Sequence, residues 1–174
     1  MATILTYNGI TPSVAAGAFV ADTAALIGEV EIGARSSVWF GCVLRGDVGK
    51  LSVGEGTSIQ DNTVMHASDG WTTTTVGDDC TVGHACILHG CLVRDRVLVG
   101  MGSILLDEVE IASDTILGAG SLVTIGTKIP SGVLALGRPA RVVRDLRPEE
   151  LDQIRDSARH YIEKTATYLS QFRD

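Results

Sequence analysis

Aliphatic residues recur at intervals of six along most of the chain. This interval fits neither an α-helix nor a simple alternating strand, and it is typical of a short strand followed by a tight turn. Three such units close a triangular coil of about 18 residues, and successive coils stack about 4.8 Å apart. The residues in register are Val20, Leu26, Ile32 and Val38, then Val76, Val82 and Leu88, then Val93, Val99, Leu105, Ile111, Leu117 and Val123.

Between these blocks the pattern continues with adjustments, through Val43, Val53, Ile59 and Val64. Some steps shorten to five residues. The two longer gaps, from Val43 to Val53 and from Val64 to Val76, are interpreted as loops inserted into the repeat. Glycine often follows the aliphatic position, which indicates a place with no room for a side chain or with positive φ. These glycines are Gly33, Gly54, Gly77, Gly83, Gly100 and Gly118.

The pattern predicts a mostly β prism over residues 1–142 followed by a helical segment over residues 143–174. One inward aliphatic residue per face fills the prism, which explains how a chain with only 5% aromatic residues can form a core. From Leu151 to Phe172 the apolar interval changes to three or four residues, as in an amphipathic helix, and Pro148 with two following glutamates fits its start. We expect the helix to pack on the prism and the flat coil faces to pack against other subunits.

The net charge of the chain limits the kinds of macromolecule that it can be expected to bind. The formal charge of -7 makes nucleic acid or an anionic membrane an unfavourable partner. The first five residues have no basic stretch and no long apolar region, so no signal peptide is evident. Without one, the four cysteines are interpreted as buried reduced thiols, and we expect a cytoplasmic protein. They are Cys42, Cys80, Cys86 and Cys91.

Two histidines fall on the same face of successive coils. His66 follows Val64 and His89 follows Leu88, so the two imidazoles are expected to stack one strand spacing apart. That separation suits two nitrogen ligands on one metal ion. These two histidines lie on the second face of their coils. His84 follows Val82 on the first face, so a corner of the prism separates it from the other two.

In a threefold assembly, the first face of one prism can oppose the second face of its neighbour. The spacing therefore predicts a homotrimer with three shared metal sites, in which His66 and His89 of one subunit and His84 of another bind each ion. Three neutral nitrogen ligands and a water molecule form an open tetrahedral Zn²⁺ site of the catalytic kind. Histidines that bind no metal are the alternative interpretation.

Four polar residues belong to the same region. Arg45 and Asp47 lie on one side of an extended segment and suit a fixed ion pair across a subunit boundary. Gln60 is a neutral amide that can hold a metal-bound hydroxide in place. Asp61 can orient Arg45 or a ligand imidazole.

The six-residue repeat resembles the hexapeptide-repeat proteins, which implies a left-handed parallel β-helix. The motifs Arg45-Gly46-Asp47, Gln60-Asp61-Asn62, Gly83-His84 and Leu88-His89-Gly90-Cys91 resemble the γ-class carbonic anhydrase family in particular. The resemblance implies a homotrimer with Zn²⁺, Fe²⁺ or Co²⁺ held by His66, His84 and His89. It also implies that Gln60 positions the hydroxide, that Arg45 and Asp47 pair between subunits, and that Tyr161 reaches over the site from the C-terminal helix.

The activity that this resemblance implies is reversible hydration of CO₂ to bicarbonate, with proton exit to buffer through Asp69 or Tyr161. In contrast to the long acidic loop of one family type, the loop after His66 is short and has one carboxylate. A hexapeptide-repeat acyltransferase, a metal-dependent hydrolase such as a thioesterase, and a non-enzymatic trimeric scaffold are the three alternatives.

Overall fold

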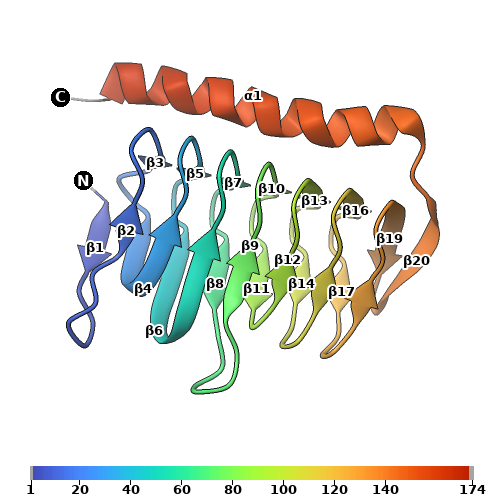
Figure 1. Cartoon of the computed structure of the whole chain (residues 1–174), viewed down its shortest axis with the longest axis horizontal. Coiled ribbons are helices and arrows are strands. Elements are labelled where there is room, and N and C mark those ends of the chain that lie inside the picture. Colours follow the sequence, from blue (N-terminus) through green and yellow to red (C-terminus); the bar gives the residue numbers. More distant parts are fainter. Residues whose placement is uncertain (1, 173–174) are drawn as a thin grey trace.

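The computed structural model describes residues 2–172; Met1 and residues 173–174, which the predicted domain bounds include, lie outside it. The chain forms a parallel β-solenoid of about seven turns, with one helix along its length (Figure 1). Triangular coils were predicted from the six-residue interval, and the mostly β fold with a C-terminal helix is confirmed.

Each coil contributes strands to three faces. Face 1 is an eight-stranded sheet, and faces 2 and 3 join into a twelve-stranded sheet because two long strands bend around their shared corner. Face 1 comprises β3 (Phe19–Val20), β5 (Ser37–Val38), β7 (Ser58–Ile59), β10 (Thr81–Val82), β13 (Val97–Val99), β16 (Thr115–Leu117), β19 (Val133–Gly137) and β20 (Ala140–Asp145). The long strands are β4 (Ala25–Ile32) and β6 (Val43–Val53).

The remaining strands complete the other two faces. Face 2 also contains β1 (Thr3–Leu5), β8 (Val64–His66), β11 (Ile87–His89), β14 (Ile104–Leu105) and β17 (Leu122–Val123). Face 3 also contains β2 (Ser13–Val14), β9 (Thr74–Val76), β12 (Leu92–Val93), β15 (Glu110–Ile111) and β18 (Lys128–Ile129). Except for the antiparallel pair β19 and β20, the strands pair in parallel between coils.

The repeat frame needs one correction in the middle of the chain. Leu44 and Met65 are fully buried, whereas Val43 is half-buried and Val64 is exposed. The interval from Val38 and from Ile59 to these buried residues is therefore six rather than five. The predicted inward position was one residue too early in both units, because a β-branched residue directly precedes the residue that points inward.

The two gaps in the repeat also differ from each other. The residues between Val43 and Val53 are not an inserted loop, because β6 runs through them as one strand that turns the corner between faces 2 and 3. The residues between His66 and Thr74 do form a loop, which projects from the solenoid between β8 and β9 (Figure 1).

The glycines after the inward positions are there for lack of space. A Cβ on Gly33 would lie 2.4 Å from the Gly54 carbonyl oxygen, and a Cβ on Gly100 would lie 2.4 Å from the Ala119 nitrogen. Neither glycine has a positive φ. Backbones of adjacent coils approach too closely for a side chain, so of the two interpretations the steric one is correct.

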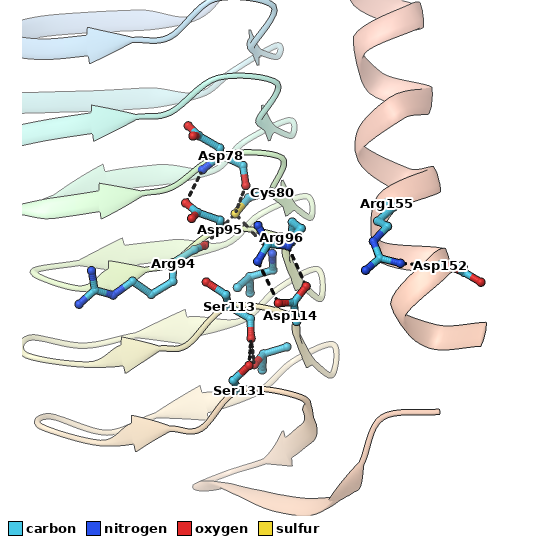
Figure 2. Close-up of polar contacts among 12 residues, drawn as sticks. Asp78, Cys80, Arg94, Asp95, Arg96, Ser113, Asp114, Ser131, Asp152 and Arg155 are labelled. Atoms are coloured by element: carbon cyan, nitrogen blue, oxygen red, sulfur yellow. Dashed lines mark hydrogen bonds and ion pairs between the residues drawn. The ribbon is translucent and has the colours of Figure 1, made fainter. Parts of the chain in front are cut away.

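Polar side chains satisfy the backbone where coils turn beside the helix (Figure 2). The Cys80 thiol donates to the Arg94 carbonyl at 3.0 Å, and the Ser131 hydroxyl donates to the Ser113 carbonyl at 2.6 Å. All four cysteines are free and buried. Burial raises the pKa of the Cys80 and Cys91 thiols to about 12, so both stay protonated and are unsuited to metal binding or nucleophilic attack.

Helix α1 (Pro148–Phe172) lies along face 1 and contacts β3, β5, β7 and β10. Ile154 and Ala158 are buried against the solenoid, as the amphipathic pattern predicts. An aromatic cluster, defined here as Phe19, Trp39, Tyr161 and Tyr168, fixes the second half of the helix. The predicted boundary after residue 142 falls inside β20, so the β part extends to Asp145. Within residues 2–172, no helix is long and apolar enough to span a membrane.

The start of α1 is held by Glu150. Its carboxylate accepts two hydrogen bonds from the Arg144 guanidinium at 2.8 Å and one from the Arg147 backbone N–H at 2.9 Å. The backbone contact is one half of a capping box, because it satisfies a donor that the first helical turn leaves free. The Arg144 and Arg147 hydrogen bonds hold the pKa of Glu150 well below its ordinary value of 4.5.

Replacing Glu150 with glutamine is therefore expected to lower the melting temperature at neutral pH. A depressed carboxyl pKa contributes stability that is present above the ordinary value and is lost as the pH falls below it. The gap between Glu150→Gln and wild type is thus expected to shrink on acidification from pH 7 to about pH 3, as thermal unfolding followed by circular dichroism will measure. Glu149→Gln is the matched control, and an equal effect of both variants at every pH would contradict this role.

Candidate metal centre

His66 and His89 lie side by side at the ends of β8 and β11. These strands pair with His89 opposite His66, which is the stacking expected from the repeat. The His66 Nδ1 and His89 Nε2 atoms are 3.3 Å apart. Two nitrogens that bind one tetrahedral ion at 2.0–2.1 Å are separated by about 3.4 Å. The pair is thus spaced as two ligands of one cation are.

Each of the three candidate histidines has a carboxylate against one ring nitrogen. The pairs are Asp47 with His66 Nε2 at 3.0 Å, Asp107 with His89 Nδ1 at 3.0 Å, and Asp61 with His84 Nδ1 at 2.9 Å. A carboxylate accepts the proton of the nitrogen that it faces, so the other ring nitrogen keeps its lone pair. Metal-binding histidines characteristically have such partners. The donor set therefore fits a divalent cation.

Arg45 extends the chain of contacts behind His66. Its guanidinium pairs with Asp47 within the same chain. Burial acts to raise the pKa of Asp47, but the hydrogen bonds from Arg45 and His66 outweigh it and hold that pKa below 3.8. Asp47 thus stays ionised and can keep accepting the His66 proton. Pairing of Arg45 and Asp47 between subunits stays a prediction.

A second group lies at the corner between faces 1 and 2. Gln60 follows β7 and is 5% exposed, Asp61 comes next, and His84 follows β10. Tyr161 reaches this corner from α1, where its hydroxyl lies near the Gln60 side chain and the Asp61 carboxylate. Burial and the nearby Asp61 charge raise the pKa of Tyr161, so its hydroxyl stays protonated at neutral pH. This group joins a neutral amide, a phenol and an imidazole.

The two groups are separate within one chain. In the described part of the chain, no hydrogen bond or ion pair links the His66 and His89 pair to His84. Residues 2–172 also contain no cluster of three or more His, Cys, Asp or Glu side chains that could hold a metal ion. The His84 side chain is 47% exposed. The chain thus presents two converging imidazoles on one face and a third, exposed imidazole at the neighbouring corner.

The sequence analysis missed Asp107. This residue follows β14, the strand that pairs with β11, so it reaches the turn that carries His89 from the next coil. The coil register places Asp107 two residues beyond Leu105, which pairs with Leu88, but the register alone does not report that the side chain reaches back to the His89 ring. Asp69, one of the two residues predicted to pass the proton to buffer, is exposed in the loop after His66.

Comparison with curated proteins finds relatives named as carbonic anhydrases. The chain is 46% identical over 166 residues to "Gamma carbonic anhydrase 2, mitochondrial" of Arabidopsis thaliana, and the match covers 92% of this chain and 60% of the relative. It is 46% identical over 165 residues to "Carbonic anhydrase" of Geobacillus kaustophilus, covering 95% and 90%. The chain thus spans 56–60% of the length of the two Arabidopsis relatives numbered 1 and 2. No family model matches.

Solved structures share the fold. A hexapeptide transferase family protein from Anaplasma phagocytophilum superposes with a TM-score of 0.92 at 46% identity, covering 96% of this chain and 98% of the other. A hexapeptide-repeat acetyltransferase from Vibrio cholerae, complexed with acetyl coenzyme A, superposes with a TM-score of 0.57 at 24% identity, covering 66% and 70%. The second likeness concerns the fold alone.

Proposed function

Because the chain belongs to the γ-class carbonic anhydrase family of left-handed β-helix proteins, we propose that it hydrates CO₂ reversibly to bicarbonate at a divalent-metal site shared between subunits. The ligands in this proposal are His66 and His89 of one subunit and His84 of the next. The cation is Zn²⁺, with Fe²⁺ or Co²⁺ as alternatives.

The single observation that carries the proposal is the set of three carboxylate–histidine pairs. In each pair the carboxylate occupies one ring nitrogen, which leaves the opposite nitrogen available as a ligand. Histidines with a purely structural role have no need of three matching carboxylate partners. When bound, the cation supplies Lewis-acid activation of a water molecule near neutral pH.

A trimer brings the third histidine into reach. Outward aliphatic side chains form a column on face 2, where Val64 is paired with Ile87 and Ile87 with Ile104. A second column lies on face 1, where Leu98 is paired with Ile116. The exposed His84 lies at the corner between the columns. The part of face 1 formed by β13 and β16, beyond the strands that α1 contacts most, against face 2 of another copy would cover both columns and carry His84 towards the neighbour's His66 and His89.

The other site residues have distinct roles in this proposal. Gln60 donates or accepts one hydrogen bond and keeps the reacting water oriented without a competing charge. The Tyr161 hydroxyl lies beside the Gln60 amide, and the buried Gln60 and partly buried Tyr161 limit access of bulk water from that side. Asp69 is exposed at the loop and suits proton release to buffer, since proton transfer must follow every hydration step.

The cellular location is proposed to be the cytoplasm, and the four free cysteines support a reducing compartment. A metal-dependent hydrolase would use the same residues on a carbonyl substrate. An acyltransferase instead depends on one catalytic histidine acting as a base, which gives no role to the other two carboxylate–histidine pairs.

The test is stopped-flow CO₂ hydration by metal-replete protein. His89→Ala removes one ligand and is expected to lower kcat/KM by at least about 100-fold, because even the partners behind such ligands contribute 10- to 100-fold. Chelation of the wild-type protein is expected to give the same loss, with recovery when Zn²⁺ is restored. Equal rates for wild type and His89→Ala would reject the proposal, as would ester or thioester turnover in the absence of CO₂ hydration.

A further inference from the structure

The Asp107 carboxylate has partners on two separate elements. It accepts from His89 Nδ1 at 3.0 Å, from the Ser68 hydroxyl at 3.2 Å and from the Thr72 hydroxyl at 3.2 Å. The side chain is 14% exposed. A carboxylate has about four lone-pair positions, so it can serve all three donors at once.

The loop that supplies Ser68 and Thr72 is closed upon itself. The Ser68 N–H donates to the Thr72 hydroxyl at 2.9 Å, and the Thr72 N–H donates to the Ser68 carbonyl at 3.2 Å. Because both hydroxyls also donate to Asp107 of the next coil, they lie at the base of the loop, where it meets the solenoid. Between them, the Gly70 N–H donates to the Val48 carbonyl of β6 at 3.5 Å, whereas the Asp69 and Trp71 side chains are exposed.

We propose that Asp107 is a positioning residue that, with one carboxylate, fixes both the orientation of the His89 imidazole and the closed form of the loop over residues 67–73. Its role towards the metal rests on the proposed function, whereas its role towards the ring and the loop does not.

The physical reason lies in the direction of the His89 proton. Because Nδ1–H donates to Asp107, the lone pair stays on Nε2, which is the atom that faces His66. Without the carboxylate, neither the tautomer nor the ring rotation is fixed. The loop is then also released, because Ser68 and Thr72 lose the acceptor that they share.

Four variants separate these effects. Asp107→Ala removes the acceptor for both the ring and the loop. Asp107→Asn keeps one oxygen acceptor in nearly the same shape. Ser68→Ala removes a loop donor while it leaves the contact between His89 and Asp107 in place. Glu108→Gln is the matched control, because it neutralises the adjacent exposed carboxylate.

The first measurement is zinc affinity, by competition with a chromophoric chelator. Asp107→Ala is expected to weaken binding 10- to 100-fold. Asp107→Asn is expected to recover part of that loss, and Glu108→Gln and Ser68→Ala are expected to bind as wild type does. Wild-type affinity in Asp107→Ala would overturn the positioning role towards the metal.

The second measurement uses metal-free protein and does not depend on the proposed function. Long-range ¹H–¹⁵N NMR of ¹⁵N-histidine protein is expected to show the Nδ1–H tautomer of His89 in wild type and in Ser68→Ala. In Asp107→Ala, a mixture of the Nδ1–H and Nε2–H tautomers is expected. Hydrogen exchange at the Thr72 amide is expected to accelerate in Asp107→Ala and Ser68→Ala. An unchanged tautomer and unchanged exchange in Asp107→Ala would overturn the inference. If the wild-type protein binds no metal, but Asp107→Ala still changes both the His89 tautomer and the exchange at Thr72, the proposed function fails. The role of Asp107 towards the ring and the loop then stands.

Discussion

An equimolar mixture of His84→Ala and His89→Ala subunits is expected to recover about one quarter of the wild-type CO₂ hydration rate, although each variant alone is inactive. The reason is the proposed sharing of each site between two subunits. His66 and His89 pair within one chain, whereas His84 lies apart at an exposed corner. A site is intact where a His84→Ala chain supplies the pair and a His89→Ala chain supplies His84.

With random assembly, each of these two conditions is met in about half of the interfaces, so about one interface in four is complete. The measurement requires co-refolding of the two variant chains and a stopped-flow assay of the unfractionated mixture, because isolated mixed trimers would each have one complete interface in three. A mixture of His66→Ala and His89→Ala chains is the matched control and is expected to stay inactive, because no chain in it carries the intact pair. No recovery in the first mixture would contradict a shared site, and recovery in the control would contradict the pairing of His66 with His89.

The regular position of residues along the coil explains which parts of the candidate metal centre could be predicted from the sequence. The six-residue repeat fixes the position of each residue along the coil, so the stacking of His66 on His89 followed from counting alone. Asp107 escaped because its role depends on reach rather than on register. Its side chain extends from one coil to a ring on the coil before it, and neither a motif nor a period reports that.

The errors in the repeat frame have a similar origin. At Val43 and Val64 two apolar residues are adjacent, and a search for aliphatic residues cannot tell which one points inward. The structure selects Leu44 and Met65, because these residues continue the columns of buried side chains above and below them. The gap after Val43 was misinterpreted for another reason. The length of the gap suggested a loop, but Gly46 and Gly49 allow β6 to turn a corner closely packed against neighbouring backbone.

The core of the solenoid leads to the largest expected effect on stability. Leu105 is fully buried in a column between Leu88 of the preceding coil and Val123 of the next. Replacing it with alanine is expected to lower the free energy of unfolding by about 2–5 kcal/mol, the usual result for a buried leucine whose cavity cannot collapse. Collapse is restricted here, because the backbone spacing between coils is set by strand pairing.

Urea denaturation of Leu105→Ala at the wild-type protomer concentration will measure the loss, since assembly would otherwise shift the apparent stability. Ile125→Ala is the matched control, because Ile125 is 59% exposed and its truncation leaves no cavity. We expect the control to change stability by less than about 0.5 kcal/mol. Similar losses in both variants would mean that the inward columns do not carry the stability of the coil. The stacking that orients His66 and His89 would then need another explanation, because it depends on the same coil register.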